Sequence, residues 1–200
     1  MKLREVNIVV SNKRTGETYL ARSFPCSDRN HNGKQELYEV PVYYVYIKGV
    51  DENGISVTKT WKALRFMPYY KPRNFPAPYR TVGWADSGLR QLGRRTSPRY
   101  NRHYQVHNTY SEYNGAIVLR DSFYIHAGPE RLAHEGWGAA GCVEVIGNFG
   151  NFKADIYKLS GSTDFDIERT LETLVEQKKL FVEVESAMAP SLKSKFKKEV

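Results

Sequence analysis

Alternating apolar and polar residues fill the N-terminal part of the chain and predict β-strands joined by short turns. Residues 4–24 have the pattern of a hairpin, in which a strand through Val10 turns at residues 13–16 and returns to Phe24. Further strands are predicted at residues 40–48, 55–64, 104–108, 116–119, 123–126, 142–146 and 180–185. Turn signals separate these strands, so we expect a mainly β fold.

One α-helix is predicted near the C-terminus. Ser162 or Thr163 is expected to cap it, and the acidic residues that follow favour the positive end of the helix dipole. Its apolar face is formed by Ile167, Leu171, Leu174 and Val175. The pattern as a whole therefore predicts a mainly β fold with one C-terminal α-helix.

Prolines interrupt the strand pattern between residues 67 and 80, where they stand among Tyr and Phe. Proline lacks a backbone N–H, so this stretch excludes a central strand or a helix, and we take it as a boundary. The predicted parts are an N-terminal β region (1–66), a Pro/aromatic and Arg-rich loop segment (67–102), a core that carries the candidate chemistry (103–190) and a basic tail (191–200). Residues 1–66 are either a separate module or part of the same sheet structure.

Composition narrows the class of protein. The 200 residues suffice for one sizeable core. A net charge of +8 favours an anionic partner such as nucleic acid, an anionic membrane or an acidic polymer, although surplus surface lysines explain the charge equally well. We expect no signal peptide and no membrane span, because no apolar run approaches the ~20 residues that a spanning helix needs. Synthesis in the cytoplasm is therefore expected.

Two reactive side chains lie beside glycines at the edges of predicted strands. His126 ends an apolar run and precedes Gly128, and Cys142 follows Gly141 and opens another run. A thiol is only slightly ionised at neutral pH, and a neighbouring imidazole can take its proton. We therefore predict that Cys142 is a nucleophile and that His126 is its general base.

The neighbouring backbone is expected to complete this site. The N–H groups of Gly141 and Cys142 are candidates for an oxyanion hole, because small residues let a substrate approach the backbone closely. No Asp or Asn is clearly placed to orient His126, so a backbone carbonyl near Ala127 or Gly128 is the alternative. No Cys/His cluster has zinc spacing, and we expect neither a metal nor another cofactor.

The loop between His126 and Cys142 must border any substrate. Its candidate substrate-binding residues, together with one residue of the following strand, are Arg131, His134, Trp137, Ala140 and Glu144. Trp137 is expected to wall an acyl chain, whereas Arg131 or His134 is expected to meet a carboxylate, with His134 as a second candidate base. For each of these residues taken singly, an ordinary solvated loop is an equally good interpretation.

Ile125-His-Ala-Gly128 followed by Gly141-Cys-Val143 resembles the catalytic motif of the L,D-transpeptidase domain family. The resemblance implies a β-sandwich in which Cys142 attacks an L,D amide bond of a peptidoglycan stem peptide. A thioester forms with His126 as base, and an amine or water then resolves it. Transpeptidase, exchange, carboxypeptidase and endopeptidase activities all remain open.

This chain departs from the family at two places. Ala139-Ala140 replaces a Ser/Thr-His pair, and Glu144 stands where Arg or Asn is common. The motif looks closer to phage-type and antibacterial effector members than to housekeeping cell-wall enzymes. This resemblance implies a protein that acts in the periplasm or cell wall after secretion or delivery. An antibacterial effector also implies an immunity protein in the producing cell.

Two other function classes compete with this hypothesis. A nucleic-acid-binding module would use the arginines of residues 90–102, but no helix-turn-helix, finger or RNA-binding signature supports it. A different cysteine amidase, such as a papain-like enzyme, usually places its Cys before its His and at a helix N-terminus. Here His126 precedes Cys142, and Cys142 opens a strand-like run.

Overall fold

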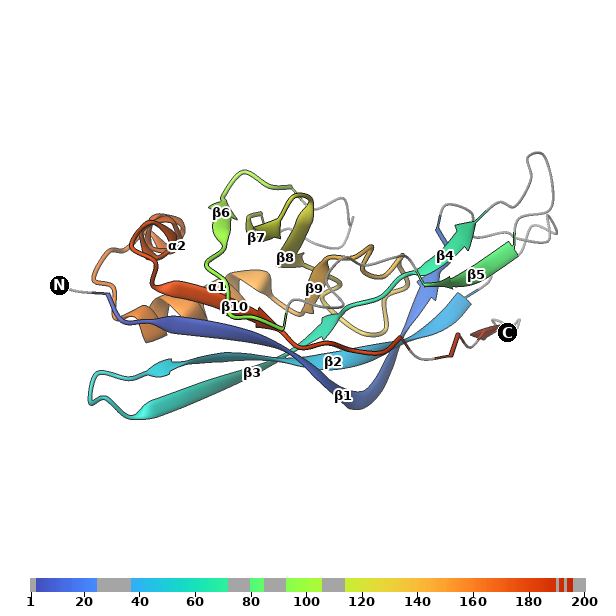
Figure 1. Ribbon diagram of the computed structural model, residues 1–200, viewed down its shortest axis with the longest axis horizontal. Coiled ribbons are helices and arrows are strands. Elements are labelled where there is room, and N and C mark those ends of the chain that lie inside the picture. Colours follow the sequence, from blue (N-terminus) through green and yellow to red (C-terminus); the bar gives the residue numbers. More distant parts are fainter. Residues whose placement is uncertain are drawn as a thin grey trace.

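A computed structural model of the protein describes residues 3–24, 37–71, 80–84, 93–105, 114–189, 191–192 and 194–195. Its strands are β1 (Val6–Arg22), β2 (Leu37–Val50), β3 (Ser56–Leu64), β4 (Pro68–Lys71), β5 (Arg80–Trp84), β6 (Arg99–Asn101), β7 (Ala116–Arg120), β8 (Phe123–Ala127), β9 (Val143–Ile146), β10 (Leu180–Val184) and β11 (Ser194–Lys195). The helices are α1 (Phe149–Ser160) and α2 (Ile167–Glu176), which lie at the opposite end of the molecule from β4 and β5 (Figure 1). The predicted mainly β fold is therefore confirmed.

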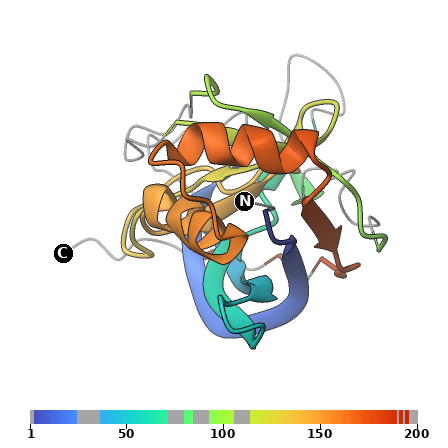
Figure 2. The ribbon, with the colours of Figure 1, turned by 90° about the vertical axis from the view of Figure 1, so that its left-hand side faces the viewer.

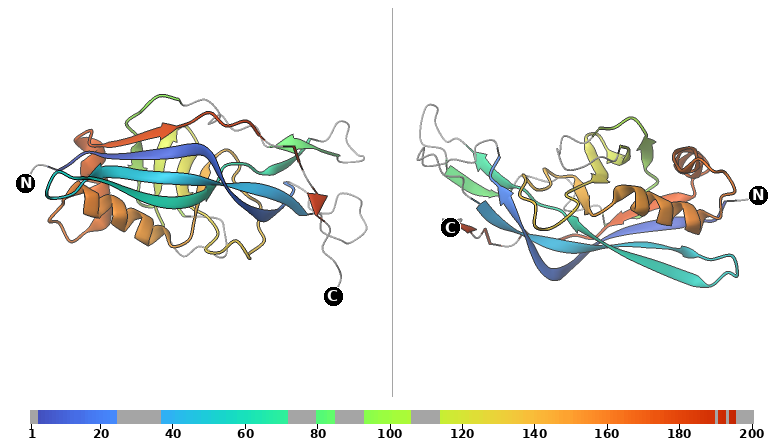
Figure 3. Two further views of the ribbon diagram at one scale, coloured as in Figure 1. Left: turned by 90° about the horizontal axis from the view of Figure 1, so that it is seen from below. Right: turned by 180° about the vertical axis from the view of Figure 1, so that it is seen from behind.

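A single large sheet contains most of these strands. Its order is β10-β1-β2-β3-β9-β8-β7-β6, with β11 added to β2, while β4 and β5 form a small sheet of their own. Seen from below, β1, β2 and β3 run side by side beneath the other strands (Figure 3). Within the described residues the large sheet is continuous and is not divided into two packed sheets.

The two edges of the large sheet meet. Thr96, just before β6, exchanges two backbone hydrogen bonds of 2.8 Å with Val182 of β10. Since β6 and β10 are the two ends of the strand order, this bridge joins them and curls the sheet around its interior. Figure 2 shows the curvature end-on, with α2 lying across one side.

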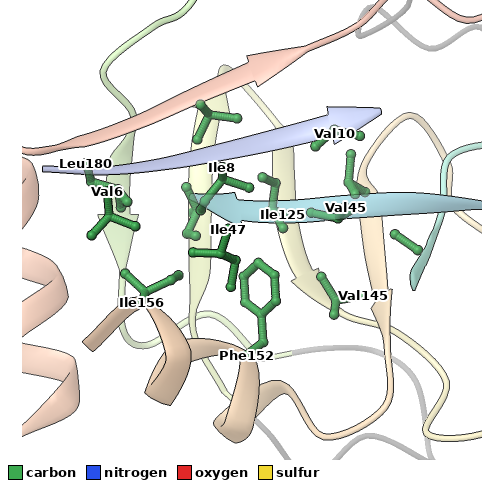
Figure 4. Close-up of a cluster of buried hydrophobic side chains, with 14 of the residues drawn as sticks. Val6, Ile8, Val10, Val45, Ile47, Ile125, Val145, Phe152, Ile156 and Leu180 are labelled. Atoms are coloured by element: carbon green, nitrogen blue, oxygen red, sulfur yellow. The ribbon is translucent and has the colours of Figure 1, made fainter. Parts of the chain in front are cut away.

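The interior of the curled sheet is an apolar core. Alternate residues of the strands point into it, as the two-residue period of a strand requires. Fully buried members include Val6, Ile8, Val45, Ile47, Ile125, Val143 and Val145. Helix α1 covers the core with Phe152 and Ile156, which rise toward Ile8 and Ile47 in Figure 4.

The predicted hairpin at residues 4–24 is wrong, because β1 is one continuous strand. It pairs with β2 along its whole length, and the pairing shifts register on both sides of Arg14. The polar stretch that resembles a turn is therefore a bulged region, in which Gly16 has a φ of +89°. The bulge carries β1 from the main core to a second cluster that contains Tyr19 and Ala21.

The prediction of a single helix is also wrong. Helix α1 precedes the predicted one, with Asn148 as its N-cap and Gly161 as its left-handed C-cap. The cap of α2 is Asp166, whose carboxylate accepts from Arg169 N, and not Ser162 or Thr163. None of the described helices is long and apolar enough to cross a membrane.

The predicted segments are joined within the large sheet. Strand β3 pairs with β9 and strand β1 pairs with β10, so residues before 66 and residues after 103 share one sheet. Tyr104 and Gln105 of the predicted strand 104–108 lie outside any strand, and residues 106–108 fall outside the described residues. In the basic tail, β11 pairs with Tyr38 and Leu37 of β2.

Replacing Phe152 with alanine is expected to destabilise the protein by about 3–5 kcal/mol, because it leaves a cavity between α1 and the sheet. Phe165→Ala is the matched control, since that side chain is fully exposed and its loss is expected to change stability by no more than about 0.5 kcal/mol. Urea unfolding of both variants measures the difference. Similar losses in the two variants would contradict the assignment of Phe152 to the core.

Candidate functional site

Parallel pairing of β8 with β9 brings His126, in β8, close to Cys142, the residue directly before β9. Ile125 is the register partner of Val143, and His126 is the partner of Glu144. Ile125 and Val143 are buried in the core, so the alternate residues His126, Cys142 and Glu144 project from the opposite face of the sheet. Cys142 lies two residues before the register partner of His126, which corresponds to a Cα separation of roughly 8 Å from strand geometry.

His126 is buried and held by its own backbone. Its Nδ1 lies 2.8 Å from the carbonyl oxygen of Ala127, one of the two carbonyls that the sequence indicated. This contact assigns the proton to Nδ1, because a carbonyl only accepts, and it leaves Nε2 as the basic nitrogen. The contact fixes the imidazole ring relative to the backbone of β8.

Two tyrosines that sequence analysis did not single out belong to the same face. The ring of Tyr104 lies 5.3 Å from the imidazole of His126 and 4.9 Å from the ring of Tyr124, measured between centroids. Burial raises the pKa of Tyr104, and the nearby Cys142 thiol adds to the increase. The sequence could have indicated Tyr124, because residues two apart in a strand lie on the same face and His126 is two residues further on. Tyr104 is far from His126 in sequence and approaches it only in the folded protein.

Cys142 is a partly buried thiol in the resting structure. Its sulfur lies 3.6 Å from the carbonyl oxygen of Ser122, to which the thiol donates. Burial raises the pKa of the thiol, a backbone hydrogen bond from Tyr124 lowers it in part, and the carboxyl of Glu144 raises it further. The cysteine therefore needs a base to become a nucleophile at neutral pH.

Glu144 stands between β8 and β3, where its register partners are His126 and Leu64. Removal from solvent raises the pKa of its carboxyl to about 8. Gly128 packs directly on it, since a Cβ on that glycine would lie 2.8 Å from the Cβ of Glu144 and 2.9 Å from the carbonyl oxygen of Val145. The glycine after His-Ala is thus required by the close approach of the chain to β9.

The predicted oxyanion hole needs a correction. The N–H of Gly141 donates to the carbonyl oxygen of Ala139 at 2.8 Å, in a tight turn where Gly141 has a φ of +94°. Because the Gly141 N–H already donates to Ala139, it is not available to an oxyanion. The Cys142 N–H is therefore the remaining candidate donor for the oxyanion hole. Ala140, between them, is exposed.

The loop between β8 and β9 is fastened at several points. Its Gly136 accepts a 2.6 Å hydrogen bond from Arg22 N, and its Ala139 N donates to the carbonyl of Phe66 at 3.2 Å. Trp137 packs edge-on against Phe24, with 6.1 Å between ring centroids, and lies under the guanidinium of Arg22. These contacts draw Trp137 toward the end of β1.

The other predicted substrate contacts of this loop are Arg131 and His134. Arg131 is exposed, and its carbonyl accepts from His134 N at 3.1 Å. This hydrogen bond closes a turn of the loop at residues 131–134.

Two arginines of the predicted basic loop make ion pairs inside the fold. Arg95 pairs with Glu5 and lies 3.6 Å above the ring of Phe181. Arg102 lies 3.4 Å from the carboxylate of Glu172 and 3.7 Å from that of Asp166. These arginines fasten the β6 segment to the N-terminus, β10 and α2. Arg90 falls outside the described residues.

Among the residues that the structure describes, no group of His, Cys, Asp and Glu is arranged to hold a metal ion. Comparisons with models of protein families, with curated proteins and with solved structures found no match for this chain. Function is therefore inferred from the geometry around Cys142 and His126.

The alkylation rate of Cys142 is expected to rise with pH through a midpoint above the ~8.5 of an ordinary cysteine, because the thiol is buried beside a carboxyl. The other cysteine of the sequence is Cys26. Iodoacetamide kinetics on a Cys26→Ser background measure this midpoint on the Cys142 thiol alone. Glu144→Gln is expected to lower it. A midpoint below about pH 7 would indicate a preformed thiolate and contradict the structure.

Glu144→Gln is also expected to change the pH dependence of stability. Between pH 4.5 and about 8, the folded protein keeps a proton that the unfolded chain has lost, so the wild-type free energy of unfolding falls as pH rises. The free energy of unfolding of the variant does not fall in this way, because glutamine does not titrate. Its difference from the wild-type value is therefore expected to increase by on the order of 1 kcal/mol from pH 4.5 to 8, allowing for partial exposure of the side chain. Urea unfolding at several pH values tests this, with Glu52→Gln in the exposed β2–β3 turn as the control.

Proposed function

We propose that this protein is a cysteine-dependent acyl-transfer enzyme that acts on peptidoglycan stem peptides through a Cys142 thioester. The observation that carries the proposal is the position of His126 in β8 beside Cys142, which directly precedes the paired strand β9, with His126 Nδ1 bound to the Ala127 carbonyl. The peptide substrate comes from the resemblance of the motif around these residues to L,D-transpeptidases.

In the proposed first step, Nε2 of His126 takes the proton of the Cys142 thiol, and the sulfur attacks the carbonyl carbon of an amide bond. The new C–S bond gives a tetrahedral oxyanion, to which the Cys142 N–H donates. The C–N bond then breaks, and the leaving amine takes the proton from His126. The products of this step are a thioester on Cys142 and a free amine.

In the second step an amine or a water molecule attacks the thioester carbonyl. His126 removes the proton of the attacking group and returns it to the departing sulfur. An amine gives transfer or exchange, and water gives carboxypeptidase or endopeptidase activity. The substrate lies outside the cytoplasm, so the proposal includes secretion or delivery, with an immunity protein as the expected partner of an antibacterial effector.

The nucleic-acid alternative depends on the arginines of residues 90–102. Arg95 and Arg102, which it would use to bind phosphates, are engaged with carboxylates of the protein itself. Binding of an anionic polymer would have to compete with these pairs.

Incubation with a tetrapeptide stem or with sacculi is expected to give a covalent acyl adduct on Cys142 and altered muropeptides, both read by mass spectrometry. Cys142→Ala is expected to abolish both signals, and His126→Ala to slow adduct formation by about 10²–10⁴-fold. Cys26→Ser is the matched control and is expected to retain activity. Identical muropeptides from the wild type and Cys142→Ala would contradict the proposal.

A further inference from the structure

Tyr104 is an aromatic residue beside His126 that the proposed acyl-transfer steps do not use. Its ring lies 5.3 Å from the imidazole, measured between centroids, with an angle of 47° between the two planes. An aromatic ring attracts a cation within about 6 Å of its centroid, because the π face carries partial negative charge. Neutral imidazole is not a cation, but the imidazolium that forms when His126 takes a proton is one. The contact therefore has a different energy in the two protonation states of His126.

The fold holds the ring of Tyr104 in this position. The ring packs edge-to-face on Tyr124, with 4.9 Å between the centroids and 68° between the planes. The backbone is fixed between β6 and β7, because the Tyr104 carbonyl accepts from Gly115 N at 2.8 Å and Tyr104 N donates to the Asn101 carbonyl at 3.4 Å. The approach of the ring to His126 thus follows from contacts on both sides of it.

The other groups near His126 come from the neighbouring strands. Opposite it on β7 is Ala116, which carries no charge. Tyr124 precedes it by two residues on β8, and Glu144 of β9 is its register partner, with Cys142 just before that strand. None of these neighbours is a lysine or an arginine, whose positive charge would repel an imidazolium. The Glu144 carboxyl is present in every variant of Tyr104, so a comparison of such variants isolates the effect of the ring.

We propose that Tyr104 is a positioning residue whose ring stabilises the imidazolium form of His126 and thereby favours the thiolate of Cys142. This inference rests on the proposed acyl-transfer function and adds a residue to its first step. In that step the proton leaves Sγ of Cys142 and is bound at Nε2 of His126, so two neutral groups become a thiolate and an imidazolium. His126 is only 5% exposed, so water does little to stabilise its charge and the ring takes over part of that role.

The role belongs to the ring and not to the hydroxyl group of Tyr104. Burial raises the pKa of Tyr104, and the Cys142 thiol adds to the increase, so the phenol is neutral at pH 7. Phenylalanine keeps the π face without the hydroxyl, whereas leucine keeps apolar bulk without a π face. The substitutions Tyr104→Phe and Tyr104→Leu therefore separate the ring from the hydroxyl and from simple exclusion of water.

An NMR titration of the imidazole protons of His126 tests the proposal without any substrate. Tyr104→Leu is expected to lower the titration midpoint of His126 by about 0.5–1 pH unit, because the charged form loses its cation–π contact. Tyr104→Phe is expected to change the midpoint by less than about 0.3 pH unit, because the π face remains. The matched control is Tyr157→Leu in α1, which packs on the core side of the sheet and is expected to leave the midpoint unchanged.

Alkylation of Cys142 gives a second reading on the Cys26→Ser background. At pH 7 the iodoacetamide rate constant is expected to be about 3–10-fold lower in Tyr104→Leu and within about twofold of the parent in Tyr104→Phe. The sign separates this role from a merely structural one. A substitution that only loosened the site would expose the thiol and speed its alkylation.

An unchanged His126 midpoint in folded Tyr104→Leu protein, or equal shifts in the Phe and Leu variants, would overturn the proposal. Tyr104→Met also lacks a π face and replaces the Leu variant if that protein does not fold. A lowered midpoint, combined with no acyl adduct of wild-type Cys142 from a tetrapeptide stem, would overturn the acyl-transfer function and leave the effect of Tyr104 on His126 in place. An adduct that forms while the midpoint stays unchanged would overturn the role of Tyr104 alone.

Discussion

Parallel pairing between β8 and β9 is the constraint on which the candidate site depends. Neighbouring parallel strands need a crossover of a dozen or more residues, because the chain must return to the same end of the sheet before it pairs again. The loop from Gly128 to Cys142 is that crossover. The distance in sequence between His126 and Cys142 is thus set by the geometry of the sheet. A register slip of one residue would turn Cys142 into the core and Val143 out of it.

The strands were predictable where local pattern and tertiary role agree. Strand β10 alternates buried and half-buried residues, and β2 is a nearly continuous buried run of strand-forming residues. The bulge of β1 was not predictable, because residues 13–16 have the composition of a turn and only their pairing with distant β2 keeps them extended. Helix α1 was missed because Gly150 and Asn151 weaken its first turn, although Phe149, Phe152, Ile156 and Leu159 recur at helical spacing.

In the candidate site, too, some features were predictable from the sequence and others depend on the fold. The Cys142 and His126 pair is visible in the sequence, because each residue sits in a short motif with glycine. The commitment of the Gly141 N–H to Ala139, the approach of Tyr104 to His126 and the desolvation of Glu144 all depend on contacts that form only in the fold. A buried network of the same origin joins Lys153 to Glu168 and Glu168 to Tyr100, which ties α1 to α2 and β6. Sequence spacing alone does not reveal such pairs.

The bridge between Thr96 and Val182 also governs how the chain can fold. β1 pairs in parallel with β10, and the curled sheet closes only when residues near 96 meet residues near 182. These partners lie far apart in sequence, so their pairing is entropically costly and is expected to come late. A nascent chain that has emerged only as far as α1 exposes one edge of β1, and that edge is a template for wrong pairing until β10 arrives. Strand β10 therefore protects the exposed edge of β1.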